Sequence, residues 1–144
     1  MYRRILVAIE HSDADGAILE HIRAFARLTG AELLLLHVAD GWVARAFDEL
    51  KLRESEEMRA DRDYLEHITK DLRDEGFEVE WKLAMGDPAS EIVRVAESEQ
   101  VDLVAMATHG HRFLGDLVRG TTVGRVRHSV SMPVLLVKAK HSQA

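Results

Sequence analysis

Residues 101–137 read VDLVAMATHGHRFLGDLVRGTTVGRVRHSVSMPVLLV and carry, in order, the signs of a strand, a loop, a helix and a second strand. The apolar run at 102–107 has the length of a strand and breaks at a polar loop. From Gly120 onward valines recur at helical spacing, and Pro133 ends that helix before the apolar run at 134–137. This stretch therefore predicts two strands joined through a glycine-spaced loop and a helix.

The loop between residues 108 and 122 is the leading candidate for a ligand site. We expect the helix after it to begin at Gly120, Thr121 and Thr122. The first backbone N–H groups of a helix have no partner within it, and they carry the positive end of the helix dipole. Because anions such as phosphate bind at such an end, the pattern predicts a phosphate near Thr121.

Two further apolar runs, at 4–9 and 33–38, are continuous rather than alternating. This is typical of strands that are covered on both faces of a parallel sheet. Between them a polar turn precedes a helix, which Ser12 or Asp13 is expected to cap and Gly30 to end. The three elements predict a right-handed βαβ unit.

The middle of the chain predicts a long, strongly charged helix that ends at Gly76. Residues 79–85 then alternate between apolar and polar side chains, which indicates a half-exposed strand at an edge of the sheet. In the following Gly86-Asp87-Pro88, the aspartate is expected to cap the next helix and the proline to occupy its first turn. Five strands thus alternate with helices along the chain.

These patterns predict an α/β fold, a three-layer, doubly wound, five-stranded parallel sheet in the order 3-2-1-4-5 with helices on both faces. In that order strands 1 and 4 are neighbours where the winding reverses, and ligands bind there at the carboxyl ends of the strands. The last strand, from Val134 to Val137, would be an edge although it is apolar throughout. Since bare apolar edges pair with other chains, we predict a homodimer through this strand.

Composition excludes several classes of protein. The 144 residues carry a net charge of −6 and no cysteine, so disulfides and thiolate metal sites are excluded. The acidic residues crowd between Asp48 and Glu80, which opposes binding to nucleic acid. The first apolar run stops at Glu10, too early for a signal peptide or a membrane span. We expect one domain, residues 1–144, in the cytoplasm, with neither nucleic acid nor membrane as a partner.

Several of these segments together resemble the universal stress protein family over nearly the whole chain. The family's opening strand followed by an acid and a serine is similar to residues 5–12, and its Leu-His-Val strand to residues 36–38. Its Gly-x-Pro helix start is similar to residues 86–88. The most specific likeness is the nucleotide-binding pattern of a glycine, two residues, a glycine, nine residues, and a glycine with serine or threonine, which falls on Ala107, Gly110, Gly120 and Thr121.

This resemblance implies ATP as the ligand, with Mg²⁺ bound to its phosphates rather than in a protein cage. The adenine would lie at the backbone of Val38, the ribose near Glu10, and the phosphates in the glycine loop. The residues implied to bind the nucleotide are Ile9, Glu10, Ser12, Val38, Ala107, Thr108, His109, Gly110, His111, Arg112, Gly120, Thr121, Thr122 and Val123.

Two positions depart from the family pattern. Ala107 replaces the first glycine and adds a methyl group where a ligand would approach, so the Ala107→Gly variant should bind equally well or more tightly. Glu10 replaces the usual aspartate and carries the same charge one methylene further out. It can still accept from ribose hydroxyls, a contact of roughly 1.5–3 kcal/mol.

The histidines and the missing catalytic groups limit the chemistry. His109 and His111 could join His11 around a metal, but a His-x-His pair without a carboxylate at defined spacing does not indicate one. His37 is expected to be a packed, hydrogen-bonded histidine. With no catalytic lysine, general base or nucleophile in view, neither a catalytic residue nor a metal ligand is assigned.

Three hypotheses of function remain open. The first is a homodimeric, ATP-binding stress or regulatory protein that acts on an unknown protein partner with little or no turnover. The second is a family member without nucleotide binding that works as a dimeric interaction module, docking through the charged helix at 51–74. The third is an enzyme of the adenine-nucleotide α-hydrolase type, which would turn ATP over repeatedly.

Overall fold

Strands and helices alternate along the whole described chain. The computed structural model describes residues 1–40, 48–109 and 116–139. In chain order the elements are β1 (Arg4–Ala8), α1 (Ala14–Thr29), β2 (Glu32–Asp40), α2 (Asp48–Asp74), β3 (Val79–Gly86), α3 (Pro88–Ser98), β4 (Leu103–Thr108), α4 (Asp116–Ser129) and β5 (Val134–Lys138).

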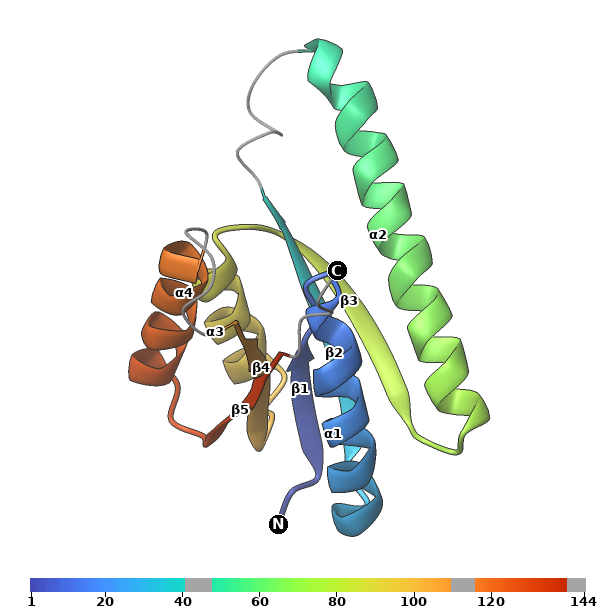
Figure 1. Cartoon of the computed structure of the whole chain (residues 1–144), viewed down its shortest axis with the longest axis vertical. Helices are drawn as coiled ribbons and strands as arrows, with labels where there is room; N and C mark the ends of the chain where they lie inside the picture. The colour runs from blue at the N-terminus through green and yellow to red at the C-terminus, as the bar shows by residue number, and fades with distance from the viewer. Residues whose placement is uncertain (41–47, 110–115, 140–144) are drawn as a thin grey trace.

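The five strands form one parallel sheet in the order β3-β2-β1-β4-β5, which confirms the predicted fold and strand order. α1 and α2 cover one face, and α3 and α4 cover the other (Figure 1). A right-handed crossover places its helix on the opposite face once the direction of winding reverses. The reversal lies between β1 and β4, so these two strands are neighbours in the sheet.

Each face of the sheet has its own hydrophobic core. Ile5 and Val7 of β1 pack with α1 and α2, whereas Leu6 between them packs with α3 and α4. Successive side chains of a strand point to opposite faces, so a strand that fills both cores must be apolar without interruption. β3, which alternates, lies at the predicted edge.

The predicted ends of two helices are confirmed. Gly30 follows α1 with a φ of 71°, in the left-handed region that glycine adopts without strain, and its amide donates to the carbonyl of Ala26. Asp87 caps α3 by accepting from the amide of Ser90, and Pro88 occupies the first helical position. The capped start of α3 therefore sits directly after the carboxyl end of β3.

α2, with 27 residues, is the longest helix, and in Figure 1 it extends beyond the end of the sheet. Its buried apolar side chains are Leu65, Ile68 and Leu72, which pack in the same core as α1. Its other described side chains are mostly polar and exposed. Within the described ranges, none of the helices has both the length and the apolar character needed to cross a membrane.

α4 begins at Asp116 and not at Gly120, which corrects the predicted helix start. Residues 116–119 therefore form its first turn. The amide of Thr121 therefore lies in the second turn, where a regular helix bonds each amide to the carbonyl four residues earlier. The prediction of unpaired amides at Thr121 is wrong, and the free amides belong to the turn at Asp116.

Candidate functional site

A cavity of about 290 Å³ opens at the carboxyl ends of β1, β2 and β4, beside α3 and α4. Its volume is close to the lower end of the roughly 300–1,000 Å³ found for small-molecule pockets. Most of its wall is apolar, and Glu10 contributes a carboxylate. The lining residues are Ala8, Ile9, Glu10, Leu36, His37, Val38, Pro88, Ile92, Met106, Ala107, Thr122 and Val123. The cavity therefore occupies the point in the sheet where ligands of doubly wound folds bind.

The loop between β1 and α1 is held by the carboxylate of Asp15, which is 2% exposed. It accepts from the amides of Glu10 at 2.9 Å, His11 at 2.8 Å and Ser12 at 3.2 Å. Asp13 occupies the N-cap position of α1, but its side chain makes no capping bond. The Ser12 hydroxyl accepts from the amide of Ala14, the first residue of α1, at 3.2 Å, so of the two expected caps Ser12 contacts the helix start and Asp13 does not.

The same carboxylate ties α2 to this loop. The hydroxyl of Tyr64 donates to Asp15 at 2.7 Å, and the Tyr64 ring stacks on His11 with centroids 4.0 Å apart. Burial, and then the bond to this carboxylate, raises the pKa of Tyr64 far above its ordinary value, so the phenol stays a donor. His11 has a φ of 62°, a conformation that costs about 1 kcal/mol for a residue with a side chain. The bonds to Asp15 offset that cost.

Glu10 and His109 meet across the reversal between β1 and β4. The Nε2 atom of His109 lies 2.8 and 2.9 Å from the two carboxylate oxygens of Glu10. The side chain of His109 is 2% exposed and that of Glu10 is 23% exposed. The hydroxyl of Ser12 also donates to Glu10, at 3.3 Å. The carboxylate is therefore oriented from two sides while part of it faces solvent.

His37 belongs to the site as well as to the strand. Its Nδ1 atom donates to the carbonyl of Ile9 at 2.7 Å, which joins the end of β2 to the end of β1. It is partly buried, as the prediction of a packed histidine requires, but it also lines the cavity. β2 thus places the imidazole of His37 in the cavity wall next to Val38.

An exposed ion pair joins the two helices that border the cavity. Arg125 of α4 contacts the two carboxylate oxygens of Asp87 at 3.1 and 2.8 Å and reaches the hydroxyl of Ser90 at 3.2 Å. The Arg125 guanidinium, and then the bonds from Ser90, hold the pKa of Asp87 well below its usual range. This pair links α4 to the capped start of α3, whose Pro88 and Ile92 line the cavity.

The structure places the predicted binding residues in several groups. Those that line the cavity are Ile9, Glu10, Val38, Ala107, Thr122 and Val123. Ser12 and His109 bond to Glu10 behind this lining. Thr108 ends β4, and Gly120 and Thr121 lie in α4. Gly110, His111 and Arg112 lie outside the described residues.

The methyl group of Ala107 is not directed only at a ligand. It forms a small buried cluster with Ala14 of α1 and Ala139, which follows β5. The side chain thus contributes to packing between these segments. This contact weakens the argument that a glycine at position 107 would improve binding.

Three residues of this region were not identified as functional from the sequence. Asp15 looks like an ordinary acid in the first turn of a helix, and Asp61 and Tyr64 look like members of a charged helix. The roles of Asp61, which contacts His11 and His37, and of Tyr64, which bonds to Asp15, depend on where α2 packs, and no local pattern predicts this. A tyrosine three residues from an aspartate is too common a spacing to serve as a signal.

The chemistry of the lining fits a nucleoside better than a bare metal ion. Apolar walls with one carboxylate suit a flat base and a pair of hydroxyl groups. Among the residues that the structure describes, no group of three or more histidine or acidic side chains could hold a metal ion.

Fold and cavity together define a doubly wound α/β protein with a cavity at the reversal of its sheet. The chain belongs to the Universal stress protein family, whose sequence model matches residues 1–138. Universal stress protein MJ0577 of Methanocaldococcus jannaschii is 33% identical over 162 residues, covering 99% of this chain and 98% of that protein. A universal stress protein of Thermus aquaticus is 30% identical over 145 residues, covering 96% of this chain and 100% of that protein.

Solved structures carry the same fold. The structure of MJ0577 matches with a TM-score of 0.83 and 33% identity, covering 99% of each chain. The universal stress protein from Archaeoglobus fulgidus in complex with dAMP matches with a TM-score of 0.67 and 23% identity, covering 95% of this chain and 98% of that one. The second likeness is one of fold, at an identity too low to transfer a site residue by residue.

Proposed function

We propose that this protein binds an adenine nucleotide, foremost ATP with Mg²⁺, in the cavity between β1 and β4, and that occupancy serves as a signal. The observation that carries the proposal is an apolar cavity with an oriented carboxylate at the reversal of a doubly wound sheet. The dAMP complex of the A. fulgidus protein, which has the same fold, supports this ligand class. With no catalytic group assigned, slow or no turnover is expected.

The base would lie between Val38 and the wall formed by Pro88 and Ile92. Glu10 would accept from the ribose hydroxyls, because its carboxylate borders the cavity and is held by His109. Thr122 lines the cavity, and Asp116, six residues earlier in α4, lies roughly 9 Å along the helix. A chain of phosphates, rather than a single one, would extend from the cavity toward the first amides of α4.

The binding test uses the purified protein. Denaturing a sample and assaying the supernatant for adenine nucleotide detects a ligand carried through purification, and calorimetric titration with ATP gives the affinity. Glu10→Ala should weaken ATP binding about tenfold or more, as expected for the loss of a charge-assisted hydrogen bond. Glu20→Ala, an exposed acid on α1, is the matched control and should leave the affinity unchanged.

The results separate the rival functions. If neither bound nucleotide nor heat of binding is found, the interaction-module hypothesis replaces the nucleotide site. Production of more than one equivalent of ADP or AMP from ATP would instead favour the hydrolase hypothesis. Binding of ATP without multiple turnover, and weaker in Glu10→Ala than in Glu20→Ala, supports the proposal.

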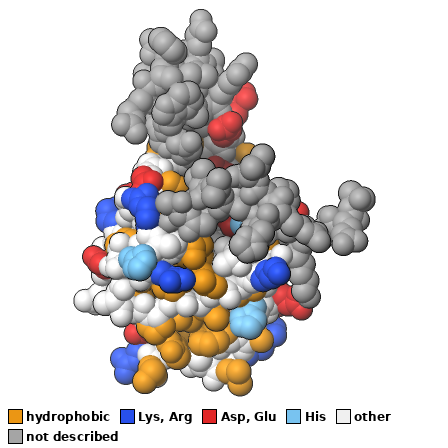
Figure 2. Space-filling model, turned by 60° about the vertical axis from the view of Figure 1, so that its left-hand side comes forward, with side chains coloured by type: hydrophobic (Ala, Val, Ile, Leu, Met, Phe, Trp, Pro, Cys, Tyr) orange, Lys and Arg blue, Asp and Glu red, His pale blue; other side chains and the backbone are white. Residues whose placement is uncertain are grey.

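The proposal includes a cytoplasmic homodimer formed through β5. This strand lies at the end of the sheet, and Leu136 on it is 37% exposed. Figure 2 shows hydrophobic side chains gathered on the side of the molecule that carries α4 and β5. Leu136→Lys should shift the protein toward monomer in analytical ultracentrifugation, whereas Leu28→Lys, at an exposed leucine of α1, should not. Equal assemblies in both variants would exclude β5 as the interface.

A further inference from the structure

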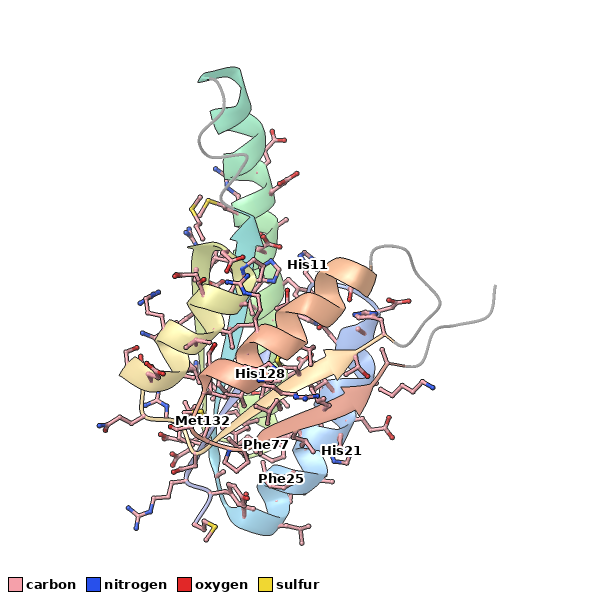
Figure 3. All side chains as sticks on the ribbon, turned by 90° about the vertical axis from the view of Figure 1, so that its left-hand side faces the viewer. His11, His21, Phe25, Phe77, His128 and Met132 are labelled. Carbon is pink, nitrogen blue, oxygen red and sulfur yellow. The ribbon has the colours of Figure 1, made fainter. Side chains whose placement is uncertain are left out.

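Asp61 of α2 faces two histidines that belong to the candidate site. Its Oδ1 atom lies 2.6 Å from Nδ1 of His11, and its Oδ2 atom lies 3.3 Å from Nε2 of His37. The side chains of His37 and Asp61 are only 13% and 14% exposed. His11 lies at the end of the sheet opposite Phe25 and Phe77 (Figure 3), the same end as the cavity. α2 therefore contacts the site through a nearly buried carboxylate.

The hydrogen bond of His37 to Ile9 and its contact with Asp61 specify where protons must be. A backbone carbonyl can only accept, so the bond to Ile9 requires a proton on Nδ1 of His37. A neutral imidazole with that proton has a lone pair on Nε2. That lone pair would then face the Oδ2 atom of Asp61, which is repulsive. The contact is favourable only when a second proton lies between the two side chains.

His11 differs from His37 in this respect. Its Nδ1 atom faces Asp61, and a neutral ring with the proton on Nδ1 can make that bond. His109 can likewise donate to Glu10 from one nitrogen as a neutral ring. His37 therefore needs one proton on Nδ1 and a second proton between its Nε2 atom and Asp61.

We propose that His37 and Asp61 share a proton and that this pair makes α2 a positioning element of the nucleotide site, so that ATP binds more weakly as the pH rises. The inference rests on the proposed nucleotide function. With the proton in place, Asp61 holds the ends of β2 and of the β1–α1 loop together, and a cationic ring lines the cavity. Without it, the contact between α2 and His37 is lost, and so is a positive charge on the cavity wall.

The groups around His37 come from every element packed against it. α2 contributes Asp61, and the β1–α1 loop contributes His11, whose ring centroid lies 6.3 Å from that of His37. Behind His11 stand Tyr64 and Asp15, which bond to each other. β3 contributes Leu83 at the paired position, and its neighbour Lys82 is engaged with Glu99. The recorded charges that face this ring are therefore carboxylates.

The test combines histidine NMR with calorimetry on the full chain. The calorimetric titrations with ATP are done at roughly pH 5.5 and pH 8, because an ordinary histidine changes its charge between about pH 5 and 8. In the wild type, NMR should show protons on both ring nitrogens of His37 at the lower pH. The affinity for ATP should then fall about tenfold between the two values, as for a lost ionic hydrogen bond.

Variants separate the pair from other effects of pH. Asp61→Asn can donate an amide proton to neutral His37, so its ATP affinity should change with pH much less than that of the wild type. His37→Asn retains a donor for Ile9 and should also lose the pH dependence. Asp71→Asn removes an exposed His67–Asp71 pair on the same helix and is the matched control, which should keep the wild-type dependence. The titration of the ATP phosphates is common to all four proteins.

Two failures are distinguishable. If His37 of the wild type lacks a proton on Nε2 at the lower pH, or if Asp61→Asn retains the full pH dependence, the shared-proton proposal is overturned even though ATP binds. If ATP binds at neither pH while His37 gains its second proton only in the presence of Asp61, the nucleotide function and its positioning by α2 both fail. The proton pair itself would then remain as a structural feature.

Discussion

The two loops at the reversal of the sheet treat negative charge in opposite ways. The loop after β1, residues 9–15, contains three acids and neither lysine nor arginine. The carboxylate of Asp15 accepts hydrogen bonds from three backbone amides of this loop. The segment from the end of β4 into α4, residues 108–123, contains two arginines and one acid. The first loop supplies its own anion, and the second has the charge to accept one from outside.

This difference assigns the parts of a nucleotide. Because the amides of the first loop are already bonded, a phosphate gains nothing there, and the Glu10 carboxylate of that loop, which borders the cavity, suits hydroxyl groups instead. The phosphates are better placed toward the first turn of α4, where amides have no partner within the helix. The acidic loop would thus orient the sugar and the basic segment would neutralise the phosphates.

Removing the internal anion should have the largest effect. Asp15→Ala leaves three amides and the Tyr64 hydroxyl without their acceptor, and we expect a loss of about 3 kcal/mol in the free energy of unfolding. Urea denaturation measures it. Asp13→Ala in the same loop, where no capping bond is made, should cost less than about 1 kcal/mol. Equal losses would mean that Asp15 does not organise the loop.

Adding an anion to the second segment should abolish binding without unfolding the protein. Gly120→Asp places a carboxylate beside the proposed phosphates, and we expect the ATP affinity to fall more than about tenfold by charge repulsion. Gly124→Asp, one helical turn further on at a position with open space, is the control and should have a smaller effect. Calorimetry and circular dichroism together would show binding and folding. An unchanged affinity in Gly120→Asp would place the phosphates elsewhere.

Asp87 is an exposed counterpart of Asp15, because its carboxylate also accepts from a backbone amide next to a helix start. Asp87→Ala should lower the stability by about 1 kcal/mol, as for loss of an N-cap. Since the Arg125 guanidinium and Ser90 lower the pKa of Asp87 in the folded protein, its contribution is present above about pH 4 and is lost as the pH falls further. Urea midpoints of the two proteins should converge on acidification. Glu97→Ala on the exposed face of α3 should show neither effect.

The smallest effect is expected at Ala107. Ala107→Gly removes a methyl group that packs against Ala14 and Ala139, so we expect a loss of about 0.5–1 kcal/mol in stability. The ATP affinity should stay the same or rise slightly, since the same residue borders the cavity. Thermal unfolding and calorimetry measure the two quantities. A rise of more than tenfold in affinity would show that the methyl group mainly obstructs the ligand.

Much of the fold was predictable because its signals are local. The continuous apolar runs of β1, β2 and β4 indicate strands buried on both faces, and the alternation in β3 indicates an edge. Gly30 and Asp87 mark helix ends through backbone geometry and capping that involve only neighbouring residues. The start of α4 was predicted wrongly. Gly120, Thr121 and Thr122 have the residue types of a helix start, but a helical turn from Asp116 already precedes them.

By itself, the sequence determined the order of elements, the strand order and the carboxylate at the end of β1, since each depends on periodicity or on a short motif. Tertiary structure alone decided which groups contact that carboxylate, the loop around it and His37. Asp15 turns back onto the loop amides, His109 reaches Glu10 from the neighbouring strand, and α2 brings Asp61 to His37. The contacts of His109 and Asp61 join residues far apart in the chain, and their geometry is set by how the strands and helices pack together.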